Sequence, residues 1–171
     1  MMNTKPVLHL ICGKIASGKS TLARQLADDH RAILISEDHW LSNLYPDEMK
    51  TVQDYVKVSE RLRGVIGPHV KSLLGAGPSV VLDFPANTPG LRQWMRDIFE
   101  GAGVSHRLHY LDVPDAVCKS RLKQRNLDGG HEFAPSDEQF DLINQYFQPP
   151  SPQEGFNLLT RTVDWDEFSQ T

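Results

Sequence analysis

Short apolar runs and longer stretches with helical spacing alternate along this chain. The apolar runs are residues 6–12, 32–35, 79–84 and 107–113. Each has the length and the apolar character of a strand buried in a parallel sheet. Between the runs, apolar side chains recur at steps of three and four, which is typical of helices with one buried face. The alternation predicts an α/β fold with a central parallel sheet and right-handed crossovers.

The helical stretches are residues 20–29, 52–74, 89–101, 116–127 and 136–147. Pro114 stands at a first helical position before the fourth of them. Ser136 and Gln139 have the form of a capping box that opens the fifth. Three prolines within residues 148–153 exclude a continuing helix, and a last strand is expected around residues 157–163.

Composition narrows the class of protein. With 171 residues, 39% hydrophobic and 23% charged, the chain suits one domain with a packed core. The net charge of −4 does not favour long-range attraction to nucleic acid.

No window approaches the roughly 20 apolar residues of a membrane span, and the start lacks the features of a signal peptide. Cys12 and Cys118 lie in apolar stretches without metal-ligand spacing, so we expect buried free thiols in a cytoplasmic protein.

The strongest chemical signal is a loop of the form G-x-x-x-x-G-K-[ST]. It comprises Gly13, Lys14, Ile15, Ala16, Ser17, Gly18, Lys19 and Ser20, and Thr21 follows it. Such a loop turns backbone N–H groups toward a phosphate, and the next helix offers its N-terminus to the same anion. Lys19 would contact the outer phosphates and Ser20 would join a magnesium shell. An accidental Gly-rich turn is disfavoured, because an apolar strand precedes the loop and an amphipathic helix follows it. ATP and Mg²⁺ are therefore the expected cofactors.

Acidic residues follow two of the predicted strands. Asp83 closes an apolar run, as in a Walker B motif, and would hold magnesium through a water; its alternative role is a cap. Asp38 would face the γ-phosphate and accept the proton of an attacking hydroxyl. Glu37 is the alternative base, and the Ser36-Glu37-Asp38 string could also cap the helix that follows. Neighbours on an extended segment point to opposite sides, so only one of the two should face the phosphate.

The rest of the chain narrows the choice among P-loop proteins. It holds no N-K-x-D string, which argues against a GTPase, and it is too short for an AAA+ core with its helical lid. It resembles the small P-loop kinases related to 5′-polynucleotide kinase, the zeta-toxin-like kinases and chloramphenicol phosphotransferase, over nearly its whole length. The matching residues are Ser36-Glu37-Asp38-His39-Trp40, Asp83 with Asn87-Thr88-Pro89 and Arg92, Leu111-Asp112-Val113-Pro114, Arg121-Leu122-Lys123-Gln124-Arg125-Asn126, and Tyr146-Phe147-Gln148-Pro149-Pro150. The last group is similar to the ending of a subset of ATP-binding proteins with unassigned substrates.

Pattern and resemblance together predict one kinase-like P-loop domain over residues 1–171. We expect a three-layer sandwich around a five-stranded parallel sheet of order 2-3-1-4-5, with a lid at about residues 121–135. In the resembled families, an Asp soon after the second strand activates the acceptor hydroxyl, and Asp38 takes that place. The polynucleotide-kinase pattern has an Arg three residues later, but this chain has Leu41. A nucleic-acid acceptor therefore loses support.

Several further side chains are candidates for the site. Arg121 and Arg125 share a helix face and would stabilise the transferred phosphoryl group, although a solvated basic face shared with the nearby lysines is the alternative. Arg125 could also cover the adenine. Arg92 would grip the acceptor or the γ-phosphate, or else form a surface ion pair. Trp40 would stack on an acceptor or belong to the core. His131 falls in the lid, where an exposed loop histidine is favoured.

The function we expect is ATP-dependent phosphoryl transfer to a hydroxyl of a small molecule. One alternative is a nucleotide-binding switch or slow ATPase that acts through a protein partner. Another is a polynucleotide 5′-hydroxyl kinase. The sequence leaves the acceptor, the choice of nucleoside triphosphate and the oligomeric state open, and it predicts no association with a membrane.

Overall fold

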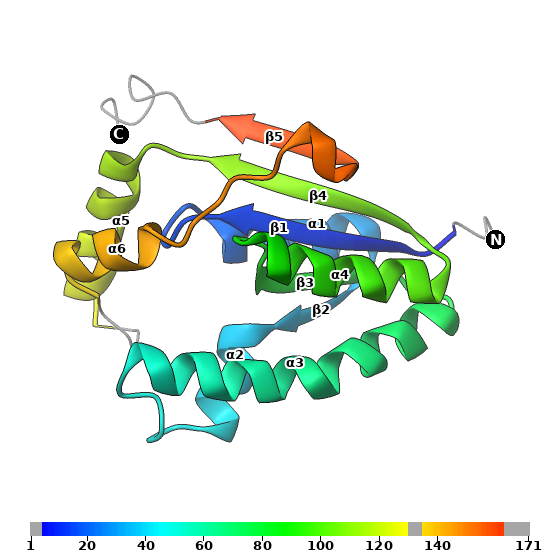
Figure 1. The fold of residues 1–171 in the computed structure, drawn as a ribbon, viewed down its shortest axis with the longest axis horizontal. Coiled ribbons are helices and arrows are strands. Elements are labelled where there is room, and N and C mark those ends of the chain that lie inside the picture. The colour runs from blue at the N-terminus through cyan, green and yellow to red at the C-terminus, as the bar shows by residue number, and fades with distance from the viewer. Residues whose placement is uncertain (1–4, 130–134, 163–171) are drawn as a thin grey trace.

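Five parallel strands form a central sheet in the computed structural model, which describes residues 5–129 and 135–162 (Figure 1). In spatial order the strands are β2 (Ile33–Ser36), β3 (Val80–Pro85), β1 (Val7–Gly13), β4 (Ser105–Asp112) and β5 (Leu158–Thr162). Leu10 of β1 lies opposite Leu82 of β3 and Leu108 of β4. The predicted order 2-3-1-4-5 and the parallel pairing are confirmed.

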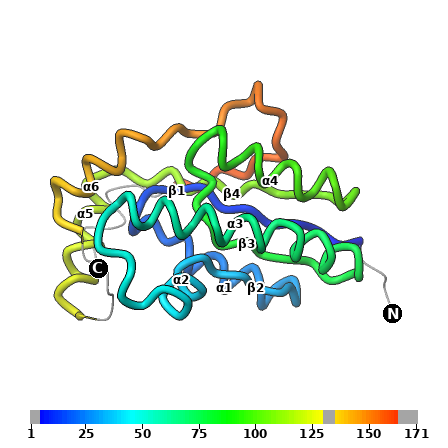
Figure 2. Tube along the Cα trace, turned by 60° about the horizontal axis from the view of Figure 1, so that its bottom comes forward, coloured from blue at the N-terminus to red at the C-terminus, as the bar shows by residue number. Residues whose placement is uncertain are grey.

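Helices cover both faces of this sheet and make the three layers. They are α1 (Lys19–His30), α2 (Glu37–Leu44), α3 (Val52–Gly75), α4 (Pro89–Ala102), α5 (Asp115–Leu127), α6 (Asp137–Asn144) and the short 3₁₀ helix η1 (Pro152–Glu154). Figures 1 and 2 show α3 and α4 side by side on one face, with α1 on the other. The carboxyl ends of the strands lead toward α5 and α6.

Two hydrophobic clusters hold the layers together. The first packs α3 and α4 onto the sheet and includes Leu10, Leu62, Ile66, Leu82 and Met95, each at most 4% exposed. The second packs α1, α5 and α6 onto the other face and includes Ile11, Leu22, Val81, Leu122 and Phe140. Alternate residues of β1 therefore belong to different clusters, as the pleat of a strand covered on both faces requires.

Local signals set the ends of the helices. A capping box opens α3, where Asp54 N–H donates to Thr51 Oγ1 (3.1 Å) and Thr51 N–H donates to Asp54 Oδ2 (3.0 Å). The capping box predicted for Ser136 and Gln139 is confirmed at the start of α6. The helix α3 runs through Pro68, a residue that usually kinks or ends a helix. Its buried apolar face continues on both sides of the proline, and this packing outweighs the local penalty.

Four details differ from the sequence-based expectations. The run 32–35 was expected to be buried, but Ile33 is 38% and Leu34 36% exposed, because β2 lies at the edge where the predicted order places it. Pro114 caps α5 instead of opening it, and α6 ends at Asn144 rather than at residue 147. Glu37 and Asp38 lie in the first turn of α2, not on an extended segment. The last strand is confirmed as β5, over a shorter range.

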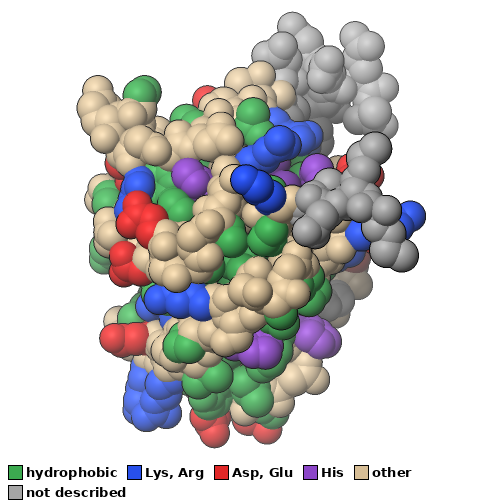
Figure 3. All heavy atoms as spheres, turned by 90° about the vertical axis from the view of Figure 1, so that its right-hand side faces the viewer, with side chains coloured by type: hydrophobic (Ala, Val, Ile, Leu, Met, Phe, Trp, Pro, Cys, Tyr) green, Lys and Arg blue, Asp and Glu red, His purple; other side chains and the backbone are tan. Residues whose placement is uncertain are grey.

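The outer surface of the molecule adds two observations. No helix in the described part of the chain is long and apolar enough to cross a membrane. Figure 3 shows the end of the molecule opposite α5 and α6, where basic, acidic and hydrophobic side chains are interspersed. On the described residues of that end, no single sign of charge dominates.

Candidate nucleotide-binding and phosphotransfer site

The glycine-rich loop joins the carboxyl end of β1 to the start of α1. Gly18 has φ +100° and Ala16 has φ +59°, so the loop twice enters the left-handed region. A Cβ on Gly13 would lie 2.4 Å from Ser17 Oγ, so a side chain there would displace the loop. Strand, loop and helix follow one another in the arrangement that presents N–H groups to a phosphate.

Lys19 folds back over this loop. Its Nζ donates to the carbonyl oxygens of Gly13 (2.8 Å) and Lys14 (2.9 Å). Burial lowers the pKa of Lys19, while the carboxylates of Asp83 and Asp38 act in the opposite direction. The ammonium group is therefore placed among acidic groups at the mouth of the loop.

Asn87 clamps the start of the loop, a role that the sequence analysis did not assign. Gly13 N–H donates to Asn87 Oδ1 (3.0 Å), and Asn87 Nδ2 donates to Gly13 O (2.8 Å). The signal for this role was the position of Asn87, which lies four residues after Asp83 and just beyond the end of β3, the strand that pairs with β1. The amide fixes the backbone at the point where the loop leaves the sheet.

The two residues expected to hold magnesium lie in contact. Ser20 Oγ donates to Asp83 Oδ2 at 2.9 Å. Burial raises the pKa of Asp83, against the hydrogen bond from Ser20, and the charge of Asp38 raises it further. A hydroxyl and a carboxylate are oxygen ligands of the kind that Mg²⁺ takes, with water and phosphate oxygens completing its shell. Among the described residues no cluster of three or more His, Cys, Asp or Glu is placed to hold a metal ion.

Asp38 and Glu37 point in different directions from the first turn of α2. Asp38 is exposed, and its charge acts on the pKa values of Lys19, Asp83 and Arg125. Glu37 is 2% exposed and accepts a hydrogen bond from Tyr55 Oη (2.7 Å). Burial raises the pKa of Glu37 to about 7. The helical turn therefore directs Asp38 toward the loop and Glu37 into the protein.

Ser36 accepts a hydrogen bond from His39 N–H (3.4 Å) at the start of α2. The capping expected of the Ser36-Glu37-Asp38 string therefore falls to Ser36, which leaves the Asp38 carboxylate available. Trp40, on the same helix, is 37% exposed and is not a core residue.

The helix α5 turns two of its cations toward the site. Arg121 Nη1 donates to Ser17 O (3.3 Å) in the loop. Arg125 is half-buried, and within the described structure its Nε has no hydrogen-bond partner. Burial lowers the pKa of Arg125, and the charge of Asp38 acts against this.

The lysines of α5 are engaged elsewhere. Lys119 pairs with Asp141 (2.7 Å) and Lys123 pairs with Asp137 (3.1 Å), both on α6. These two lysines therefore pair with carboxylates of α6 instead of sharing a solvated basic face with the arginines, which lie on the side of the loop. Of the expected lid, residues 130–134, with His131, lie outside the described residues.

Arg92 is held inside the protein rather than at the site. Its side chain is 1% exposed, and its Nε pairs with Glu154 at 2.8 Å. Its Nη1 donates to Ala86 O (2.9 Å) and Gln148 O (2.8 Å). The ion pair expected as an alternative exists, but it is buried and not on the surface. This geometry argues against the expected grip on an acceptor.

Three remaining loop residues have other surroundings. Lys14 Nζ pairs with Asp115 (2.5 Å), which ties the loop to α5. Ile15 packs against the second hydrophobic cluster. Thr21 is exposed on α1. Both cysteines are buried free thiols, as expected.

Comparison with known proteins places the chain in a family. Residues 8–150 match the family model described as an AAA domain. A curated relative, the protein KTI12 homolog of Arabidopsis thaliana, is 26% identical over 144 residues. That match covers 83% of this chain and 47% of the relative, so the chain spans about half the length of the curated relative it matches. We expected no AAA+ core with a helical lid, and the match runs from β1 through α6, ending before η1 and β5.

Solved structures share the fold at low sequence identity. A candidate kinase from Chloroflexus aurantiacus superposes with TM-score 0.78 at 19% identity, covering 96% of this chain and 91% of its own. The APS kinase CysC of Mycobacterium tuberculosis, in complex with AMPPNP and APS, has TM-score 0.64 at 20% identity, covering 97% and 94%.

Kti12 of Chaetomium thermophilum, in complex with ADP-AlF3, also has TM-score 0.64, at 19% identity and with 94% and 90% covered. These likenesses establish the fold alone. Because the family model covers more than half of its residues, the chain belongs to this AAA domain family, and its fold is that of the P-loop kinases.

Proposed function

We propose that this protein transfers the γ-phosphoryl group of ATP to a hydroxyl group of a small molecule. The observation that carries the proposal is the position of Asp38. This exposed carboxylate lies within electrostatic reach of Lys19, Asp83 and Arg125, at the end of the sheet where the glycine-rich loop opens. Ligands of open α/β sheets bind at the carboxyl ends of the strands, which is where these groups converge.

Each residue has a defined task in the proposed reaction. The loop and Lys19 hold the phosphates of the nucleotide, with Thr21 and Arg125 beside them. Ser20 and Asp83 would hold Mg²⁺, the latter through a water, and the ion would neutralise charge on the phosphates. Asp38 positions the acceptor hydroxyl and takes its proton.

The bond changes follow from this arrangement. The acceptor oxygen bonds to the γ-phosphorus, the bond from that phosphorus to the bridging oxygen breaks, and ADP leaves with the electron pair. Lys19, Arg121 and Arg125 stabilise the negative charge on the moving group, because positioned cations act strongly where water is excluded.

The comparisons support the proposal without extending to its substrate. Three structural relatives are named as an APS kinase, a sugar kinase and a gluconokinase, and such enzymes phosphorylate small molecules. We also propose a single cytoplasmic domain over residues 1–171 whose acceptor is a small molecule and not a nucleic acid. The buried Leu41, 1% exposed, leaves no cation at the position where the polynucleotide kinases have one.

Asp38→Asn tests the proposal directly. The variant keeps the shape of the side chain but cannot take a proton. We expect nucleotide affinity to stay within about twofold of the wild type, while transfer from labelled ATP to a mixture of small hydroxyl compounds falls by roughly 100- to 10,000-fold.

Glu37→Gln is the matched control, since it makes the same chemical change one residue away at a buried position. We expect this variant to keep most of the transfer. Wild-type transfer by Asp38→Asn, or loss of transfer by Glu37→Gln alone, would contradict the assignment.

A second candidate function is a nucleotide-dependent switch or slow ATPase that works through a protein partner. The observation that favours it is the match to a KTI12 homolog and to a Kti12 structure, which are not named as kinases. This function predicts release of free phosphate that depends on a partner, and no phosphorylated acceptor. A polynucleotide 5′-hydroxyl kinase is a third candidate, tested by adding a 5′-hydroxyl oligonucleotide to the same assay.

A further inference from the structure

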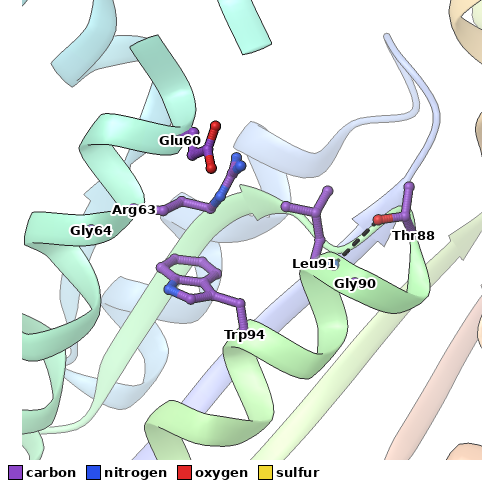
Figure 4. A pocket seen from close by; sticks show the side chains of 7 residues that line it. All are labelled: Glu60, Arg63, Gly64, Thr88, Gly90, Leu91 and Trp94. Atoms are coloured by element: carbon purple, nitrogen blue, oxygen red, sulfur yellow. Dashed lines mark hydrogen bonds between the residues drawn. The ribbon is translucent and has the colours of Figure 1, made fainter. Parts of the chain in front are cut away.

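A groove of about 440 Å³ lies between α3 and α4 (Figure 4). Its lining residues are Glu60, Arg63 and Gly64 from α3 and Thr88, Gly90, Leu91 and Trp94 from α4. The Trp94 ring packs onto Phe84 of β3, with 5.6 Å between the ring centroids. Gly67 allows α3 to approach this ring, because a Cβ there would lie 3.1 Å from Trp94 Nε1. Apolar walls with a few polar groups are typical of sites for small molecules.

Arg63 supplies a positive charge to this groove. Figure 4 shows its side chain reaching from α3 toward α4. The side chain is half-buried, and its Nη1 donates to Ser59 Oγ at 3.0 Å. No carboxylate of the described residues lies within ion-pair distance of it, in contrast to Arg92 and Arg96 on α4. Glu60 brings a carboxylate to the same groove, beyond ion-pair distance of Arg63. A charge-assisted hydrogen bond from the guanidinium to a bound anion is stronger than its bond to the Ser59 hydroxyl.

The α3 wall of the groove leads toward the proposed base. The charge of Arg63 lowers the pKa of Glu37 and of Tyr55, against the larger effect of their burial. Arg63 is therefore within electrostatic reach of the residue that precedes Asp38. Glu37 Oε1 is buried and has no hydrogen-bond partner in the described structure.

The α4 wall leads to the phosphate-binding loop. Thr88 caps α4, and its Oγ1 accepts from Leu91 N–H at 3.2 Å. The preceding residue is Asn87, whose side chain is bonded to Gly13 on both its amide atoms. The groove thus lies between α3, which contacts α2, and α4, whose capping residue Thr88 directly follows the residue bonded to Gly13.

We propose that this groove binds the phosphate acceptor and that Arg63 binds an anionic group of that acceptor. The anionic group is a carboxylate or a phosphate, and it is separate from the hydroxyl that is phosphorylated. This assignment rests on the proposed kinase function and names the class of its substrate. The planar guanidinium forms two parallel hydrogen bonds with either anion, and it fixes orientation as well as affinity. Trp94 gives the acceptor an apolar surface.

The test uses the indole N–H resonance of Trp94 in the protein of residues 1–171, assigned with Trp94→Phe. The loop is first filled with Mg²⁺ and AMPPNP, so that added anions do not bind there. Acceptor candidates are then titrated as pairs that differ in their anionic group. Gluconate with glucitol and glycerol 3-phosphate with glycerol are the first pairs, followed by other hydroxy acids and sugar phosphates with their neutral partners.

We expect an anionic member to shift the Trp94 resonance saturably, while its neutral partner does not. Arg63→Gln should weaken this binding roughly 10- to 100-fold, the value of a charge-assisted hydrogen-bonded pair. Arg61→Gln is the matched control, since Arg61 is exposed on the same helix and the change in charge is the same. Unaltered amide spectra outside the groove show that each variant is folded.

Three results would overturn the inference: no anion that binds better than its neutral partner, equal affinity in Arg63→Gln and the wild type, or equal weakening in Arg61→Gln. The proposed kinase function fails separately, since its test is phosphoryl transfer. Saturable anion binding without any transfer would retain the anion site and refute the kinase.

Discussion

Acid is expected to destabilise this protein through two buried histidines on the α1 face of the sheet. His9 of β1 is 1% exposed and His109 of β4 is 2% exposed, with 3.2 Å between His9 Nδ1 and His109 Nε2. His30 of α1 stacks on His9, with 4.6 Å between the ring centroids. Burial lowers the pKa of both His9 and His109 to about 4, and the nearby side chains of His30 and Arg107 lower both pKa values further, as Arg161 does for His109.

The size of the effect follows from these pKa values. In the unfolded chain each imidazole takes a proton near pH 6.5, but in the folded protein it does so only near pH 4. Between those values the unfolded state binds more protons, so the free energy of unfolding falls as the pH falls. Each histidine accounts for about 3 kcal/mol over this window. The pair therefore removes a large part of the roughly 5–15 kcal/mol that stabilises a typical domain.

Glu37 acts in the opposite direction. Its pKa is raised from 4.5 to about 7, so the folded state binds the extra proton in this window. The free energy of unfolding consequently rises by about 3 kcal/mol as the pH falls from 7 to 4.5. In the wild type this gain offsets about one of the two histidines, and the measured slope understates the effect of the pair.

Urea unfolding followed by tryptophan fluorescence, repeated between pH 4 and 7.5, separates the contributions. His109→Leu should reduce the loss of stability on acidification by about 3 kcal/mol, and Glu37→Gln should increase it by a similar amount. His69→Leu, at an exposed position of α3, is the control and should leave the profile unchanged. A profile in His109→Leu that runs parallel to the wild type would refute the reasoning.

Three further predictions concern other parts of the site and core. Asn87→Ala removes both hydrogen bonds to Gly13, so it should reduce the free energy of unfolding by about 2 kcal/mol, measured by urea unfolding. It should also weaken nucleotide binding, measured by titration. If both values stay unchanged, Asn87 does not hold the start of the loop. Arg92→Met leaves the partner carboxylate and two carbonyl groups without their donor and should cost about 3 kcal/mol of stability. A fully stable Arg92→Met that had lost only acceptor binding would restore the role predicted from the sequence. Cys12 and Cys118 are buried, and burial raises the pKa of both thiols. A disulfide reagent at neutral pH should therefore react with them only after unfolding. Rapid reaction of the folded protein would contradict their burial.

The sheet and the phosphate-binding loop were predictable because their signals are local. The apolar runs give the strands, and the spacing of the glycines and Lys19 gives the loop between β1 and α1. The exposure of β2 was not predictable from its apolar run alone, although the predicted strand order places β2 at the edge of the sheet. Ile33 and Leu34 have the apolar character of buried residues, and their exposure depends on which strands flank β2 in the sheet.

The side chains of the site were harder to assign, because their roles depend on contacts distant in the sequence. Asp38 was expected to be the base and Glu37 the alternative, but the reason that only one of them faces the phosphate assumed an extended segment, and the chain forms a helix there. Arg92 had the position of a ligand-binding residue, but its partner Glu154 lies 62 residues away in η1. Arg63 carries no motif, and only the packing of α3 against α4 places it in a groove.

The measurement that tests the proposed phosphoryl transfer most directly is a crystal structure of the protein with Mg²⁺ and a non-hydrolysable ATP analogue. We predict that the γ-phosphate lies beside Lys19, that Ser20 and Asp83 lie in the shell of the metal, and that Asp38 faces the γ-phosphate across a space open to the groove. A γ-phosphate exposed to solvent, with the Asp38 carboxylate turned back onto the first turn of α2, would contradict the transfer and favour a switch that works through a protein partner.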